Sequence, residues 1–334
     1  MLGLVAAAIV VVLPLLVAGG WFLYQLDPPG GPGGEVSVDV EPGWGNAEIA
    51  DALADEDVVG SSFAFRAYVR LTDAGPFQAG SYSLRTKLGV RAAVSMLEAG
   101  PEFAYEELAL PPGLTLVEIA ARVGELEGRD AESFHELATS GTIRSRLQPD
   151  DVASLEGVTW PDTYFVSAEQ SDEELLELLV DRFDSEAAAA GIDDAATSGL
   201  TPYESVVVAS LIQTEAGVAT DRPLISAVIR NRLADGMPLQ IDATVLYARG
   251  GGDRPITESD KALASPHNTY AVAGLPPTPI ATITTEALKA ALVPADVPYR
   301  FYVLIDPSGE HAFAVTFEEH ERNVDEARAL GLLD

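Results

Sequence analysis

A single glutamate at the end of an apolar helix is the clearest candidate for chemistry in this chain. The helix is predicted to begin at Thr201, which has the capping-box spacing to Glu204, and to end at Gly217 in a left-handed turn. Glu215 falls in its last turn, on the same face as apolar residues three, four and seven positions earlier. Burial and the negative end of the helix dipole would both favour a protonated carboxyl. Such an acid can protonate the leaving oxygen of a glycosidic bond; the alternative is a side chain turned out to solvent.

Two later segments supply polar groups that suit a sugar. Gln240 and Asp242 come from one segment, and Asn268 and Tyr270 come from the other. Amide, carboxylate and phenol groups can bind sugar hydroxyl and N-acetyl groups, so all four are candidate substrate contacts; the alternative is hydrogen bonding within loops. Asp242 is also the candidate second carboxylate of an inverting hydrolase, in which two acids flank the bond and leave room for water.

The remaining polar residues predict neither a metal site nor a cofactor. His311 is placed at the start of a predicted strand and His320 on the following helix, without the i, i+4 pairing of a zinc-binding helix, which favours structural roles. Arg230 and Arg232 fall on different faces of another predicted helix. One of them could hold a carboxylate, and exposure to solvent is the alternative.

Composition narrows the class of protein. The 334 residues are enough for two or three units with a sizeable core. A total of 20 Lys and Arg against 52 Asp and Glu gives a net charge of −32, which argues against nucleic acid or anionic lipid as a partner. Because the chain has no cysteine, a disulfide framework and a thiolate zinc site are excluded. The acidity suits a high-salt or extracytoplasmic setting.

The N-terminal stretch predicts a membrane anchor over residues 1–26. Residues 2–26 carry no charge and are long enough to cross a bilayer as a helix. A cleaved signal peptide is the alternative, but the apolar region is long for one and lacks a positive leader. Residues 27–34, rich in Pro and Gly, predict a linker. These features predict a single-pass protein of the cell membrane whose remaining chain is extracytoplasmic.

Hydrophobic periodicity predicts a mixed α+β fold, with helices and short hairpins in place of a repeating βαβ pattern. Helices are expected over residues 46–55, 62–72, 90–100, 131–140, 171–191, 221–235 and 285–292. Strands are expected from residue 35 to the Pro42-Gly43 turn, over residues 80–84, and on both sides of the Asp306–Gly309 turn as a C-terminal hairpin. Pro42-Gly43 and Pro112-Gly113 are each followed by Glu-Ile-Ala at the same spacing, which predicts two related strand–turn–helix units.

Five stretches of the second half carry motifs in a fixed order. They are Leu155–Tyr164, Ala209–Gly217 (ASLIQTEAG), Asn231–Tyr247, Ser265–Ile280 (ending in GLPPTPI) and Phe301–Val324. In order and spacing these stretches resemble the endolytic murein transglycosylases of the YceG-like family, over about two thirds of the chain. Residues 35–101 look like that family's LysM-like module, residues 102–334 like its catalytic domain, and the N-terminal span fits its anchor.

The resemblance implies non-hydrolytic cleavage between N-acetylmuramic acid and N-acetylglucosamine in nascent peptidoglycan strands. Glu215 matches the family's catalytic glutamate, which protonates the glycosidic oxygen and then takes the proton of the muramyl C6 hydroxyl, leaving a 1,6-anhydro end. Glycan strands, and with them cell-wall synthases, are the implied partners. The motif departs from the family at Gln213, where a glutamate is usual, and at Ala243, where a proline is usual.

A function of a different class is a glycan-binding scaffold that positions cell-wall synthases without cutting. Tight glycan binding with no new chain ends would identify it. The inverting hydrolase built on Glu215 and Asp242 would instead give reducing ends, so the chemical nature of the new ends separates all three possibilities.

Overall fold

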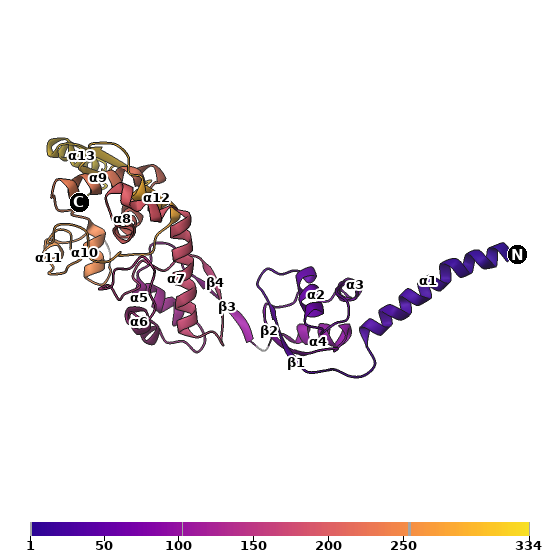
Figure 1. Cartoon of the computed structure of the whole chain (residues 1–334). Coiled ribbons are helices and arrows are strands. Elements are labelled where there is room, and N and C mark those ends of the chain that lie inside the picture. The colour runs from indigo at the N-terminus through magenta and orange to yellow at the C-terminus, as the bar shows by residue number, and fades with distance from the viewer. Residues whose placement is uncertain (1, 102, 253–254, 334) are drawn as a thin grey trace. The chain divides into compact units, whose positions relative to one another are not determined.

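The chain divides into two compact units. The structure, a computed structural model, describes residues 2–101, 103–252 and 255–333, with side chains described from Leu13 onward except at 103–104 and 196–198. Unit 1 comprises Met1–Glu107 and Phe165–Gln170, and unit 2 comprises Leu108–Tyr164 and Ser171–Asp334 (Figure 1). The first segment of unit 1 thus ends six residues after the boundary predicted at residue 101, and a later strand segment returns to this unit.

Unit 1 is built on a sheet with the strand order β1-β2-β3-β4. Its elements are α1 (Leu2–Leu26), β1 (Glu35–Val40), α2 (Asn46–Asp55), α3 (Ser62–Thr72), β2 (Gly80–Arg85) and α4 (Val90–Ala99). Strands β3 (Phe103–Ala109) and β4 (Thr163–Ser167) cross the boundary between the units, and residues 103–107 and 165–167 belong to unit 1. Strands β1 and β2 pair antiparallel, with Val38 opposite Tyr82. Both side chains join Leu53 of α2 and Phe65 of α3 in a core that excludes water. Apolar burial of this kind is what holds a small module together.

Helix α1 forms where the sequence predicts one. Within the described residues, however, no helix combines the length and the hydropathy that crossing a membrane requires. The membrane anchor therefore stays a prediction from the sequence.

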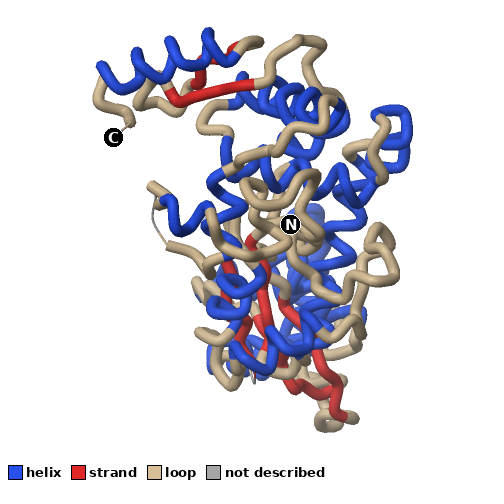
Figure 2. Tube along the Cα trace, turned by 90° about the vertical axis from the view of Figure 1, so that its left-hand side faces the viewer, coloured by secondary structure: helices blue, strands red, loops and turns tan. Residues whose placement is uncertain are grey.

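Unit 2 is mainly helical and carries a separate two-stranded hairpin. Its elements are α5 (Leu116–Val123), α6 (Ala131–Thr139), α7 (Asp172–Ala189), η1 (Ile192–Ser198), α8 (Pro202–Glu215), η2 (Ala219–Asp221), α9 (Arg222–Ala234), α10 (Asp242–Ala248), α11 (Glu258–Lys261), α12 (Thr285–Leu292), β5 (Phe301–Leu304), β6 (His311–Ala314) and α13 (Phe317–Ala329). Helix α8 lies at the centre and packs against α9, α10 and α12. Helix α13 runs along the β5–β6 hairpin (Figure 2). The predicted α+β class and C-terminal hairpin are confirmed.

Helix α8 begins as predicted but ends differently. At its start the Thr201 hydroxyl accepts the Glu204 N–H at 3.1 Å, and the Glu204 carboxylate accepts the Thr201 N–H at 2.7 Å. At its end Ala216 is extended, and Gly217 does not have the left-handed φ that was predicted. A Cβ atom at Gly217 would lie 2.6 Å from the Cα of Gly309. The glycine is needed because the hairpin turn packs directly on the end of the helix, beside Glu215.

Both predicted strand–turn–helix motifs form. Strand β1 leads through Pro42-Gly43 into α2, and β3 leads through Pro112-Gly113 into α5. The two glycines have φ angles of 87° and 89°, a conformation that favours glycine. Strand β4 and helix α11 were not predicted, because neither stretch is long enough to show a clear period.

Candidate active site

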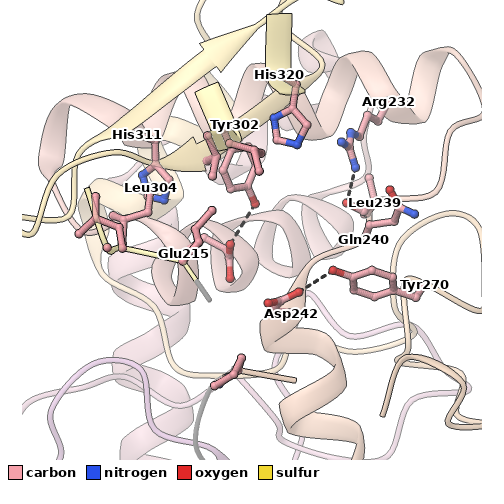
Figure 3. Close-up of a pocket in the computed structure, with 16 residues that line it drawn as sticks. Glu215, Arg232, Leu239, Gln240, Asp242, Tyr270, Tyr302, Leu304, His311 and His320 are labelled. Carbon is pink, nitrogen blue, oxygen red and sulfur yellow. Dashed lines mark hydrogen bonds between the residues drawn. The ribbon is translucent and has the colours of Figure 1, made fainter. Parts of the chain in front are cut away.

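A cavity of about 580 Å³ lies in unit 2 at the end of α8. Glu215 lines it from α8, Asp242 from the start of α10, and Tyr302 from strand β5. Gln240 and Tyr270 line it from the loops before α10 and after α11. Figure 3 shows the carboxyl groups of Glu215 and Asp242 extending into the same space. The structure therefore brings four of the five predicted site residues, Glu215, Gln240, Asp242 and Tyr270, to one cavity.

Glu215 is the last residue of α8 and is half-buried. Val208, Leu211 and Ile212, which were expected to share its face, are fully buried behind it. The Tyr302 hydroxyl donates a hydrogen bond to Oε2 of Glu215 at 3.1 Å (Figure 3). The carboxyl thus has apolar packing on the helix side and an oriented hydroxyl on the hairpin side, so its position at the cavity wall is defined.

Tyr302 is held in turn by a buried aspartate–histidine pair. The His311 ring packs edge-on against Tyr302, with 5.4 Å between ring centroids and an angle of 87° between the ring planes. His311 Nδ1 lies 2.9 Å from Oδ2 of Asp221, and the same oxygen accepts the His311 backbone N–H at 2.8 Å. Asp221 is 3 % exposed. Asp221 therefore fixes the His311 ring, which supports the tyrosine that contacts Glu215.

Asp242 and Tyr270 form a second oriented pair in the cavity. The Tyr270 hydroxyl donates to Oδ1 of Asp242 at 2.5 Å. Burial, together with the Asp242 carboxylate, raises the pKa of Tyr270 above its ordinary value of 10.0, so the phenol remains a donor. The two segments are joined by the hydroxyls of Thr244 and Thr269, 2.9 Å apart. This buried hydrogen bond explains how residues so far apart in the sequence meet.

Asn268 does not line the cavity, contrary to the prediction that it contacts substrate. Its side chain is fully buried, and its amide nitrogen donates to the carbonyls of Lys261 and Leu263 at 3.0 and 2.8 Å. Its Oδ1 atom accepts the Tyr270 N–H at 3.0 Å. Loop hydrogen bonds, the alternative considered for this residue, account for all of these contacts. Through this last contact Asn268 holds the backbone of Tyr270, which does line the cavity.

Gln240 lies in the cavity wall with an unusual backbone. It is exposed, and its φ of 51° falls in the left-handed region that residues other than glycine rarely adopt. Such a conformation costs about 1 kcal/mol and persists only where the surroundings impose it. Here the Gln240 N–H donates to the carbonyl of Thr269 at 3.1 Å. The strained turn presents the amide side chain to the cavity.

Of the two arginines that could hold a carboxylate, the structure places Arg232 in the site. Arg232 of α9 is 9 % exposed and lines the cavity, where exposure to solvent was one expectation. Its Nε donates to the Arg300 carbonyl at 2.5 Å, and its guanidinium carbon lies 5.1 Å from the centre of the Phe301 ring. Arg230, two residues earlier, is not among the residues that line this cavity.

The departure at Gln213 has a structural explanation. The Gln213 side-chain oxygen accepts the Thr284 hydroxyl at 2.9 Å and the Thr284 N–H at 3.3 Å. Thr284 is the N-cap of α12. An amide oxygen serves this purpose as well as a carboxylate, so Gln213 joins α8 to α12 without a second charge close to Glu215.

The histidines serve packing and hydrogen bonding in the part of the chain that the structure describes. No three side chains of His, Asp or Glu converge there in a way that could hold a metal ion. His320 stacks on Phe301 at 5.2 Å, and burial lowers its pKa below the ordinary value of 6.5.

A second buried acid lies outside this cavity. Glu156 is 3 % exposed; its Oε1 accepts the Leu116 N–H and its Oε2 accepts the Tyr247 hydroxyl, both at 3.0 Å. Burial raises its pKa from 4.5 to about 7, although both hydrogen bonds act in the opposite direction. Glu156 borders another cavity, of about 780 Å³, together with Thr214 and His267. It belongs to the Leu155–Tyr164 motif, whose spacing gave no sign of this burial.

The sequence did not predict Tyr302 and His311 as site residues, and it offered Arg232 only as one of two arginines that could hold a carboxylate. Tyr302 is 87 residues from Glu215 in the sequence, and its strand shows only the alternation expected of any hairpin. Arg232 lies on a helix with other arginines. Only the motif order of the Phe301–Val324 stretch hinted that the hairpin belongs to the site.

Comparison with known proteins identifies relatives over most of the chain. Residues 38–326 match the YceG-like family. An endolytic murein transglycosylase from Bacillus subtilis is 30% identical over 325 residues, covering 92% of this chain and 90% of the relative. One from Streptococcus pneumoniae is 27% identical and covers 95% of this chain, which spans 64% of that longer relative. The crystal structure of a YceG-like protein from Listeria monocytogenes superposes with a TM-score of 0.60 at 27% identity, covering 86% of this chain and 98% of the other.

Proposed function

The chain belongs to the YceG-like family, and from that premise we propose that it is an endolytic murein transglycosylase in which Glu215 is the general acid and then the general base. The observation that carries the proposal is the placement of Glu215 in a cavity of about 580 Å³, held by a hydroxyl and surrounded by groups that suit a sugar. The curated relatives with this name support the reaction class.

In the proposed reaction one carboxyl group performs both proton transfers. Glu215 gives its proton to the glycosidic oxygen between N-acetylmuramic acid and N-acetylglucosamine, and the bond from the muramyl C1 to that oxygen breaks. The muramyl C6 hydroxyl then bonds to C1, and its proton passes to the Glu215 carboxylate. The enzyme is restored, no water is consumed, and the muramyl end carries a 1,6-anhydro ring. Tyr302 supports both steps by holding Oε2 in place.

Gln240, Asp242 and Tyr270 are proposed to hold the sugars. Their amide, carboxylate and phenol groups line the same cavity as Glu215. Because Asp242 is also there, an inverting hydrolase with Asp242 as the base that activates water is the second candidate. Cleavage in water labelled with heavy oxygen separates the two. The transglycosylase leaves anhydro ends without label, whereas labelled reducing ends in the mass spectrum would contradict the proposal.

We further propose that residues 1–26 anchor the protein in the cell membrane, with residues 27–34 as linker and an extracytoplasmic catalytic unit. Residues 35–101 are proposed to be a LysM-like module, which the order β1-α2-α3-β2 supports. Cell-wall synthases are the proposed protein partners. Retention of the full chain in the membrane fraction after alkaline carbonate washing tests the anchor, and release into the wash would contradict it.

A further inference from the structure

We infer that Arg232 binds a carboxylate of the murein substrate, and that the enzyme thereby selects anionic glycan strands. The inference rests on the proposed function. It begins from an unusual feature of the cavity: a cation that is largely removed from solvent and whose counter-ion is not supplied by the described protein.

The immediate contacts of Arg232 are neutral. Its Nη1 donates to the carbonyls of Pro238 and Leu239 at 3.2 and 2.7 Å, and Nε donates to the Arg300 carbonyl. Phe301 covers one face of the guanidinium. None of the ion pairs among the described residues includes Arg232. These contacts fix the guanidinium in one orientation and leave its charge without a described carboxylate.

The ionisable groups around Arg232 do not supply that charge either. Three ionisable groups interact electrostatically with Arg232: Tyr302, Tyr270 and His320. Burial raises the pKa of Tyr270 and lowers that of His320, so at neutral pH both are uncharged. Two carboxyl groups line the same cavity as Arg232: Asp242 accepts a hydrogen bond from Tyr270, and Glu215 accepts one from Tyr302. Neither forms a described ion pair with Arg232.

A buried cation without a carboxylate partner is costly, and burial does lower the pKa of Arg232. The chain has 52 acidic residues and only 20 basic ones, yet none of the acidic residues forms a described ion pair with this arginine. An arginine held this way is preorganised for a planar anion that arrives with the ligand, since guanidinium and carboxylate geometries match. With a net charge of −32, the protein's long-range field repels anions, so a local cation is what an anionic substrate requires.

Murein offers carboxylates from two sources. Each muramyl residue carries a lactyl ether, whose carboxylate is uncovered when no peptide is attached, and the stem peptides carry carboxylates of their own. Both present the same planar anion, attached to the muramyl residue that is proposed to bind in the cavity. The guanidinium lies in the wall that also holds Leu239 and Gln240 (Figure 3).

The test compares strands whose carboxylates are intact with strands whose carboxylates are converted to methylamides. Two substrates are used: uncross-linked strands with stem peptides, and strands from which an amidase has removed the peptides. The full-length wild type, Arg232→Gln and Arg232→Lys are assayed for kcat/KM from the release of anhydro ends. Arg230→Gln, on the same helix but not lining the cavity, is the matched control, and thermal unfolding reports whether each variant folds.

We expect amidation to lower the wild-type kcat/KM by about 30-fold or more, the effect of removing one partner of a buried charged pair. Arg232→Gln should cut intact strands as poorly as the wild type cuts amidated ones, and should be insensitive to amidation. Arg232→Lys should recover only part of the loss, and Arg230→Gln should behave as the wild type. A fall in the wild-type kcat/KM on amidation of the peptide-free strands identifies the lactyl carboxylate as the group bound. A fall only on amidation of the peptide-bearing strands identifies a carboxylate of the stem peptide.

Equal cleavage of intact and amidated strands by the wild type would overturn the inference, and this arm needs no variant to fold. The inference would also be overturned if Arg232→Gln lost activity but remained as sensitive to amidation as the wild type, because the role of Arg232 would then be structural. Calorimetric binding of the same strands to Glu215→Gln gives the comparison without turnover. If no anhydro ends form at all, the proposed function fails. Binding of intact and amidated strands to the wild type and to Arg232→Gln then still decides whether Arg232 recognises a carboxylate.

Discussion

Replacing Glu156 with glutamine should make unit 2 more stable at neutral pH and remove part of its pH dependence. Glu156 is 3 % exposed, and burial raises its pKa from the ordinary 4.5 to about 7. A glutamine has the same shape and remains uncharged at every pH. Its oxygen can accept the Leu116 N–H, and its amide can donate to the Tyr247 hydroxyl, so the two hydrogen bonds are replaced and not lost.

The magnitude follows from the two pKa values. Because the folded protein holds this proton more tightly than the unfolded chain, the favourable contribution is complete below about pH 4.5 and is lost as the pH rises through about 7. One pKa unit corresponds to about 1.4 kcal/mol. The wild type should therefore lose about 3 kcal/mol of unfolding free energy from this group between pH 4.5 and pH 8, and Glu156→Gln should not.

Urea unfolding of both proteins at a series of pH values measures this difference. Subtracting the two curves cancels the titration of other groups, and an unchanged denaturant slope shows that the folded states are alike. Glu177→Gln, the same substitution at an exposed position, controls for the loss of one negative charge. A wild-type and Glu156→Gln difference that is constant from pH 4.5 to 8, or that changes in the opposite sense, would refute the reasoning.

Three further substitutions test the site. Tyr302→Phe removes the hydroxyl that orients Glu215, so kcat should fall about 10- to 100-fold with little change in KM; an unchanged kcat would show that the contact is idle. Asp242→Asn should still release anhydro ends, at a lower rate, when the products are analysed by mass spectrometry; loss of all cleavage in this variant, together with reducing ends from the wild type, would favour the hydrolase. Gly217→Ala places a methyl 2.6 Å from the backbone of the hairpin turn, so it should lower the unfolding free energy by about 1–3 kcal/mol and reduce activity, and an unchanged urea midpoint would count against that packing.

The sequence was informative where signals are local. The capping box of α8 is set by residues three apart, and the helix begins where that spacing predicts. Strand alternation and turn residues likewise predicted the C-terminal hairpin. The motif order predicted the family, which the comparisons confirm.

The sequence was uninformative where a feature depends on contacts between distant segments. Asn268 was predicted to bind sugar, yet its side chain is fully buried and its amide nitrogen donates to two loop carbonyls. Gly217 looked like a left-handed helix end, but it is required by the approach of Gly309. The burial of Arg232 depends on carbonyls that follow it on two separate segments, so no spacing within its own helix reveals it.

The role of Glu215 in the proton transfers remains a prediction, and product analysis of one variant tests it most directly. Purified wild type and Glu215→Gln are incubated with uncross-linked glycan strands, and the released fragments are identified by mass spectrometry, with thermal unfolding as the control for folding. The account predicts 1,6-anhydro-muramyl ends from the wild type and none from a normally folded Glu215→Gln. Anhydro ends released by that variant at a rate close to that of the wild type would contradict it.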